Sequence, residues 1–114
     1  MSGTKYTIAI TEIGVDNPTY VQAQDTVVWQ CDSSINSAAI TFTGSEPFTK
    51  SLGGTVTLGS NGTSSTYTVT NDAKTGKYPY NVVVKMGNAQ TTYSCDIQVM
   101  SAGTALPGTH GLVG

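Results

Sequence analysis

The chain has 114 residues and a mass of 11.8 kDa, which is the size of a single domain. Only 11% of its residues are charged, against about 25% in an average soluble domain, and its five basic residues are all lysines. A nucleic-acid-binding protein needs a cluster of basic residues, and a membrane-spanning helix needs roughly 18 consecutive apolar residues, so both classes are excluded.

Alternation of apolar and polar residues predicts an all-β chain. In residues 5–13, for example, Ile8 and Ile10 share one face of a strand, and Thr7 and Ala9 share the other. The expected strands are residues 5–13, 19–22, 25–31, 38–43, 55–58, 65–70, 77–85 and 91–99. Seven to nine short strands at this spacing predict a two-sheet antiparallel Greek-key sandwich.

The same pattern predicts the turns and the core. Residues 16–18 have turn composition, residues 32–37 form a polar loop, and the Asn-Gly pair in residues 59–62 predicts a hairpin turn. The outward faces are mostly Thr and Ser, which number 19 and 11. The residues expected in the core are Ile8, Ile10, Val27, Trp29, Ile40, Phe42, Tyr67, Val69, Tyr80, Val82, Val84, Ile97 and Val99.

The two cysteines, Cys31 and Cys95, lie on these inward faces. A lone pair so far apart lacks the four closely spaced ligands of a zinc site, and neither residue has a basic neighbour in sequence to activate it. Three interpretations stay open: two buried thiols, a disulfide between strands, or a redox role. A disulfide that closes this long loop would contribute about 4 kcal/mol.

Residues that could carry chemistry are sparse. The carboxylates are isolated, although the loops that hold Asp32 and Asp72 could meet at one end of the sandwich and supply oxygens for calcium. The one histidine, His110, lies in the C-terminal stretch, so no base is available to activate a serine. We therefore expect no enzyme, no catalytic residue, no cofactor and no metal site.

Two surface motifs have a structural and a functional interpretation. Asn61 begins the N-glycosylation pattern Asn-Gly-Thr, but it also fits a plain turn. Tyr78, Tyr80 and Tyr93 could form a platform for sugars, yet Tyr80 and Tyr93 are in phase with core valines, which favours packing in the core. The chain begins without a secretory leader pattern, which favours a cytoplasmic protein or a component of an assembled particle.

Residues 101–114 form a Gly- and Pro-containing tail behind a β-sandwich domain of residues 1–100. A tail of this composition rarely orders itself. Its apolar residues Leu106, Leu112 and Val113 could hold it against its own domain or against a neighbouring copy as an added strand.

Residues 25–99 resemble the cupredoxin-like β-sandwich family. The matching segments, in order, are DTVVWQ at 25–30, ITF at 40–42 followed by PF at 47–48, GKYPY at 76–80 and DIQV at 96–99. The resemblance implies a Greek-key sandwich.

The copper site of that family does not carry over. The family places a histidine where residues 32–37 have none, a thiolate where this chain has Val82, and a second histidine near Lys85. Met86 stands close to the position of an axial ligand, but a blue-copper site needs two histidines and one cysteine. The resemblance is therefore to a copper-free member.

The immunoglobulin fold is the second resemblance. The sequence Tyr93-Ser94-Cys95 is similar to a tyrosine corner, and the spacing from Cys31 suits a bridge between sheets. The tryptophan expected after the first cysteine is absent, since Trp29 precedes it.

The low charge and the Thr-rich faces favour association, because charged residues are depleted at interface cores and few lysines protect the sheet edges. The first hypothesis is a non-enzymatic structural protein that self-assembles into homo-oligomers through these faces and the tail. The alternative is a monomeric module that binds a protein or a carbohydrate through loops 32–37, 44–54 and 71–76 at one end. A redox or copper carrier is a third hypothesis.

Overall fold

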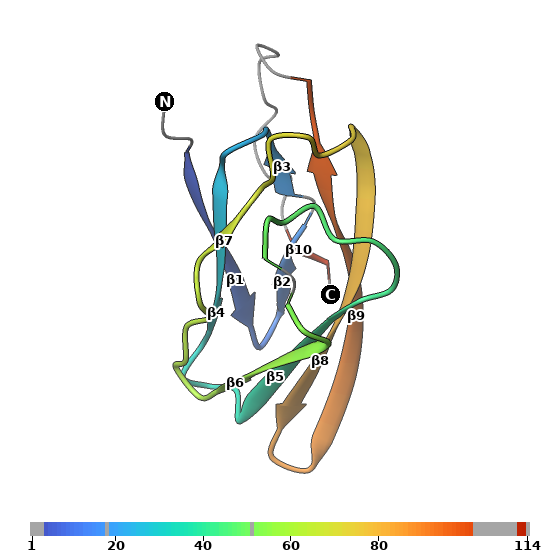
Figure 1. The fold of residues 1–114 in the computed structure, drawn as a ribbon. Helices are drawn as coiled ribbons and strands as arrows, with labels where there is room; N and C mark the ends of the chain where they lie inside the picture. The colour runs from blue at the N-terminus through green and yellow to red at the C-terminus, as the bar shows by residue number, and fades with distance from the viewer. Residues whose placement is uncertain (1–3, 18, 51, 102–111, 114) are drawn as a thin grey trace.

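The computed structural model describes residues 4–17, 19–50, 52–101 and 112–113, which fold into two five-stranded sheets that pack face to face (Figure 1). Sheet A has the order β10-β2-β1-β4-β7, with β1 at Lys5–Thr11, β2 at Gly14–Asp16, β4 at Thr26–Cys31, β7 at Tyr67–Thr68 and β10 at Leu112–Val113. Sheet B has the order β3-β9-β8-β5-β6, with β3 at Thr19–Val21, β5 at Ser37–Phe42, β6 at Thr55–Gly59, β8 at Gly76–Met86 and β9 at Ala89–Val99. The all-β, two-sheet prediction is confirmed.

The sheets are mixed, which corrects the expectation of purely antiparallel pairing. Strand β1 runs parallel to β4, with Lys5 opposite Thr26 and Ile10 opposite Cys31, and β3 runs parallel to β9. Alternation along one strand shows which residues face inward, but it carries no information about which strand lies alongside. None of the described residues belongs to a helix that could cross a membrane.

The chain changes sheets near residue 17, where a simple turn was expected. Strand β2 belongs to sheet A and β3 to sheet B, and the side-chain Oδ1 of Asn17 accepts a hydrogen bond from the backbone N–H of Asp96 at 2.8 Å. Strand β1 ends at Thr11, two residues earlier than predicted. Ile13 lies in the following turn with 70% of its surface exposed.

The turn at Gly59–Gly62 forms as predicted, but the hairpin does not. Asn61 has a φ of 61°, and the N–H of Gly62 donates to the carbonyl of Gly59 at 2.9 Å. The chain then leaves sheet B and runs beside β4 in sheet A, where the N–H of Ser64 donates to the carbonyl of Trp29 at 2.8 Å. The long hairpin is β8–β9, whose tip extends beyond the other strands (Figure 1).

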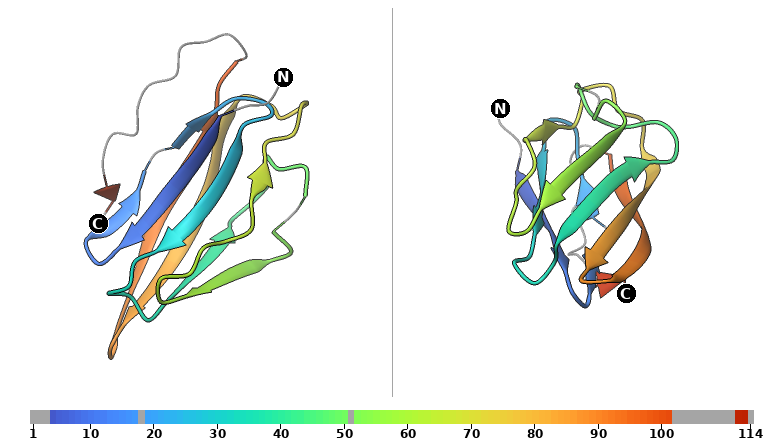
Figure 2. Two further views of the ribbon diagram at one scale, coloured as in Figure 1. Left: turned by 90° about the vertical axis from the view of Figure 1, so that its left-hand side faces the viewer. Right: turned by 90° about the horizontal axis from the view of Figure 1, so that it is seen from below.

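The predicted core residues are all buried except Tyr67, which is half-buried. The sequence pattern missed Ile35, which is buried although it lies in the predicted polar loop, and it missed Phe48 and Leu52. In the loop of residues 44–54, residues 47–49 run beside β7, and the N–H of Thr49 donates to the carbonyl of Thr68 at 2.8 Å. This long loop closes the side of the sandwich between β6 and β7 (Figure 2).

The end of the C-terminal segment pairs with its own domain. In the antiparallel pairing of β10 with β2, Leu112 lies opposite Asp16 and Val113 lies opposite Val15. Leu106, the third apolar residue of the predicted tail, lies outside the described residues. A contact between the tail and a neighbouring copy stays a prediction.

Candidate functional site

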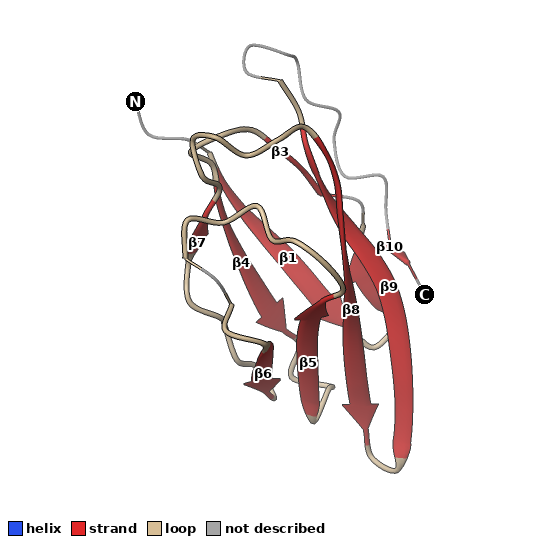
Figure 3. Cartoon of the chain, turned by 45° about the vertical axis from the view of Figure 1, so that its right-hand side comes forward, coloured by secondary structure: helices blue, strands red, loops and turns tan. Residues whose placement is uncertain are grey.

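The outer face of sheet B brings the predicted Thr and Ser surfaces together across four neighbouring strands (Figure 3). Residues directly opposite one another form two continuous rows across β6, β5, β8 and β9. The first row contains Thr55, Thr41, Asn81 and Ser94, and the second contains Thr57, Ala39, Val83 and Thr92. We call these eight residues the threonine face. None of them carries a charge, and each is exposed or half-buried.

Hydrogen bonds run sideways within the first row. The hydroxyls of Thr41 and Thr55 lie 2.8 Å apart, and the hydroxyl of Ser94 donates to Oδ1 of Asn81 at 3.4 Å. A polar side chain that already has a partner costs less free energy to remove from water than one that has none. The threonine face can therefore be covered by another surface at a smaller desolvation cost than a charged sheet face.

One charge stands at each end of the threonine face. Lys85 lies in the next row toward the β8–β9 turn, opposite Ser37 and Gln90. Asp96 lies in the next row toward the other end, opposite Pro79. Oδ1 of Asp96 accepts a hydrogen bond from Nε2 of Gln98 at 3.0 Å, and Lys85 forms no ion pair within the described residues.

The two cysteines are unbonded in the structure. Cys31 lies in β4 of sheet A and Cys95 lies in β9 of sheet B, and both are buried. Burial raises the pKa of both thiols, with a smaller contribution from the neighbouring carboxylates, and it raises the pKa of Cys95 to about 12. The disulfide stays an open alternative to two buried thiols, and a thiol titration distinguishes the two.

Thiols held in this way are expected to be inert in the native protein. A pKa of about 12 leaves roughly one Cys95 in ten thousand as the reactive thiolate at pH 8. Ellman's reagent should therefore detect no thiol in the folded protein at pH 8 and two thiols after denaturation in guanidinium. Zero thiols after denaturation would show a disulfide, and fast labelling of the native protein would contradict the burial.

The tyrosines do not form an exposed platform for sugars. Tyr80 is fully buried and Tyr93 is buried, while the hydroxyl of the half-buried Tyr78 donates to the carbonyl of Lys74 at 2.6 Å. The hydroxyl of Tyr80 and Nε1 of Trp29 are buried without a hydrogen-bond partner among the described residues. Burial places the pKa of Tyr80 well above its ordinary value.

The three loops predicted to form one binding end lie at both ends of the sandwich. Loops 44–54 and 71–76 share one end, where a backbone hydrogen bond of 2.9 Å joins residues 70 and 47. Loop 32–37 lies at the other end, where the N–H of Asn36 donates to the carbonyl of Lys85 at 2.8 Å. The prediction of a single loop site was wrong, because β5 runs along the sandwich between loop 32–37 and loop 44–54.

The candidate metal positions are dispersed in the same way. Asp32 and Asp72 fall at opposite ends, so the prediction that their loops could meet was wrong. Val82, at the position of the family's thiolate, is buried, and Lys85 is exposed. His110 lies outside the described residues, and no three His, Cys, Asp or Glu side chains gather elsewhere in the described chain.

A shallow hollow of about 210 Å³ lies where β1 and β4 end. Its lining comprises Ala9, Ile10, Thr11, Gln30, Cys31, Asp32 and Asn61. This volume is below the roughly 300–1,000 Å³ of ordinary ligand pockets. The threonine face is thus the more extensive candidate for an interaction surface.

Comparison of the chain with protein-family models, with curated proteins and with solved structures finds no match.

Proposed function

We propose that this protein is a non-enzymatic structural protein that self-assembles, with the threonine face as its main contact surface and the C-terminal segment as a second one. We also propose that it is a copper-free sandwich of the cupredoxin-like, Greek-key type. The observation that carries the assembly proposal is the pair of uncharged rows across four strands of sheet B. Charge depletion at the centre of a surface patch is what distinguishes interface cores from the remaining surface.

The test is the mass in solution by light scattering across a concentration series, with electron micrographs of the same sample. Assembly predicts a mass above 11.8 kDa that rises with concentration. A constant mass of one chain at all concentrations would overturn the proposal and support the alternative, a monomeric binding module.

A charge placed on the threonine face is expected to break the assembly. Thr41→Lys puts an ammonium group in the first row, and association would then bury that charge without a partner. We expect at least a tenfold increase in the dissociation constant, measured by light scattering. The control is Thr7→Lys, the same change at an exposed position of β1 in sheet A. Equal weakening by both variants would contradict a specific role for this face.

A further inference from the structure

We propose that two copies of this chain form a symmetric dimer in which their threonine faces pack with strands antiparallel and Lys85 of each copy contacts Asp96 of the other. This inference rests on the proposed function, and it names the partner and the relative orientation of the two copies. It is carried by the positions of the two charges that flank the uncharged rows.

The two charges are placed symmetrically about the centre of the threonine face. Along β8, Asn81 and Val83 lie in the two uncharged rows, Lys85 lies one row beyond Val83, and Pro79 lies one row beyond Asn81. Asp96 is the direct neighbour of Pro79 on β9. A rotation of 180° about an axis between the two rows and across the strands therefore exchanges the Lys85 row with the Asp96 row.

In this orientation, the threonine faces of two copies have complementary charges. In a two-fold interface, a contact from Lys85 to Asp96 of the second copy is accompanied by the reverse contact, so two opposite-charge pairs form. Packed sheets lie about 10 Å apart and neighbouring strands about 4.8 Å apart. The four-carbon stem of lysine and the short side chain of aspartate together suit a diagonal contact across such a gap.

The other face-to-face orientation lacks this complementarity. If the symmetry axis ran along the strands, the Lys85 row of one copy would cover the Lys85 row of the other. The two ammonium groups would then lie near each other, and like charges at an interface disfavour the wrong arrangement. The antiparallel orientation is therefore the one that the charges select.

The size of the surface agrees with a concentration-dependent dimer. Four strands about 4.8 Å apart and four rows about 6.7 Å apart cover roughly 500 Å² on each copy. The total of about 1,000 Å² lies at the lower limit for a specific interface. The contribution of two ion pairs to such an interface should be measurable, and it should weaken as salt is added.

The experiment reverses each charge separately and then mixes the variants. Lys85→Glu and Asp96→Lys each convert two attractive contacts into two repulsive ones, so each variant alone should dimerise at least tenfold more weakly than the native chain. An equimolar mixture should recover native affinity. In the mixed dimer, the glutamate introduced at position 85 of one chain meets the lysine introduced at position 96 of the other, while the native Asp96 of the first chain meets the native Lys85 of the second. Affinities are read by analytical ultracentrifugation at low and high salt, and circular dichroism confirms that each variant folds.

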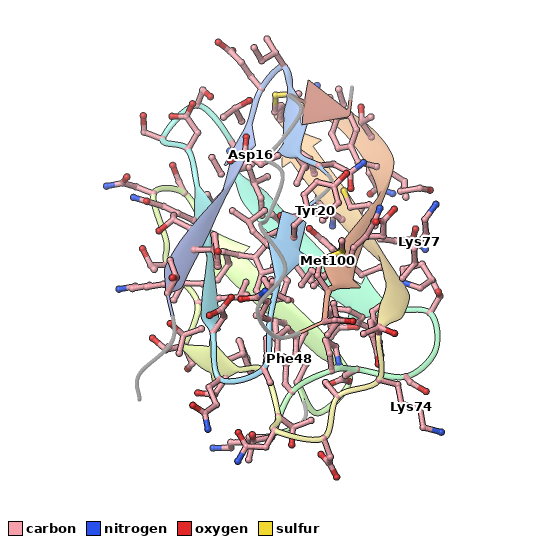
Figure 4. The ribbon with its side chains drawn as sticks, turned by 90° about the horizontal axis from the view of Figure 1, so that it is seen from above. Asp16, Tyr20, Phe48, Lys74, Lys77 and Met100 are labelled. Carbon is pink, nitrogen blue, oxygen red and sulfur yellow. The ribbon has the colours of Figure 1, made fainter. Side chains whose placement is uncertain are left out.

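The control variant is Lys77→Glu, which makes the same charge change on the same strand and face, one row beyond Pro79 and outside the two charged rows. In the view from above, Lys77 points outward from the sandwich (Figure 4). Its dimerisation should stay within about twofold of native. This variant has the same net charge as Lys85→Glu. Any difference in dimer affinity between the two variants is therefore due to the position of the charge.

The outcomes separate this inference from the proposed function. Weakening by both reversals with recovery on mixing supports the antiparallel dimer. If Thr41→Lys weakens association but the reversals do not, or if the mixture fails to recover, the orientation is overturned while the threonine face stands as a contact. If the native chain is a monomer throughout, both proposals fall.

Discussion

Replacing Trp29 with alanine is expected to lower the free energy of unfolding by about 3–5 kcal/mol, the usual range for removal of a large buried aromatic side chain. Trp29 is fully buried, and four aromatic rings contact it edge-on. The ring centroid of Tyr80 lies 5.6 Å from that of Trp29, and the ring centroid of Phe42 lies 6.2 Å from it. The four rings belong to β5, β7, β8 and the 44–54 loop, so the cavity would weaken contacts from both sheets.

The measurement is urea unfolding followed by far-ultraviolet circular dichroism, because Trp29 is the only tryptophan and its fluorescence disappears with it. Trp29→Phe is the matched control. It keeps an aromatic ring and loses no hydrogen bond, since Nε1 has no partner among the described residues. We expect it to lose clearly less stability than the alanine variant. A loss below about 1 kcal/mol for alanine would show that the two sheets do not depend on this residue.

The prediction of the core from the sequence succeeded where a residue's environment is set by its own strand. Trp29 and Cys31 alternate with the exposed Gln30 in β4, and this local pattern suffices to orient them. Ile35 and Phe48 could not be found in this way, because they lie in loops that fold back over the core. Their burial depends on contacts with distant segments, such as the bridge between Phe48 and Val69.

The candidate site shows the same division between local pattern and long-range pairing. That Thr41 and Thr55 face outward follows from alternation, and an uncharged Thr-rich surface was predicted. Alternation does not show that the two threonines continue one row with Asn81 and Ser94. This row depends on the pairing of β5 with β8 and of β8 with β9. Strand register between segments far apart in the chain is set by the whole fold, so the row and its flanking charges had no signal in the sequence.

Asp25→Ala is expected to destabilise the protein by about 2–5 kcal/mol, although it removes only one small polar side chain. Asp25 is 4% exposed, and its carboxylate accepts two backbone hydrogen bonds. Oδ1 accepts from the N–H of Thr4 at 2.9 Å, and Oδ2 accepts from the N–H of Gln22 at 2.8 Å. Alanine would leave the N–H groups of Thr4 and Gln22 without this carboxylate, and a hydrogen bond to a charged group contributes about 1.5–3 kcal/mol.

The control is Asp72→Ala, the same substitution at an exposed turn, where Oδ1 accepts from the hydroxyl of Thr70. It should change the free energy of unfolding by about 0.5 kcal/mol or less. Asp25→Asn should fall between the two, because the amide keeps one acceptor oxygen and turns a donor toward the other N–H. Urea unfolding at pH 7 orders the three variants, and equal stability of the two alanine variants would contradict the role of Asp25.

The loss of stability in Asp25→Ala should be greatest near the substituted residue, and amide hydrogen exchange can show where it occurs. The side chain of Asp25 joins the residue before β1 to the turn before β4, and its carbonyl accepts from the N–H of Val69 at 2.8 Å. These contacts stand beside the first pair of the parallel β1–β4 ladder, Lys5 opposite Thr26. In Asp25→Ala, amide hydrogen exchange should therefore accelerate most at Thr4 and Gln22 and then along β1, while the β8–β9 hairpin changes only as far as global stability falls. Uniform acceleration across both sheets would show that Asp25 acts on the whole fold and not on this junction.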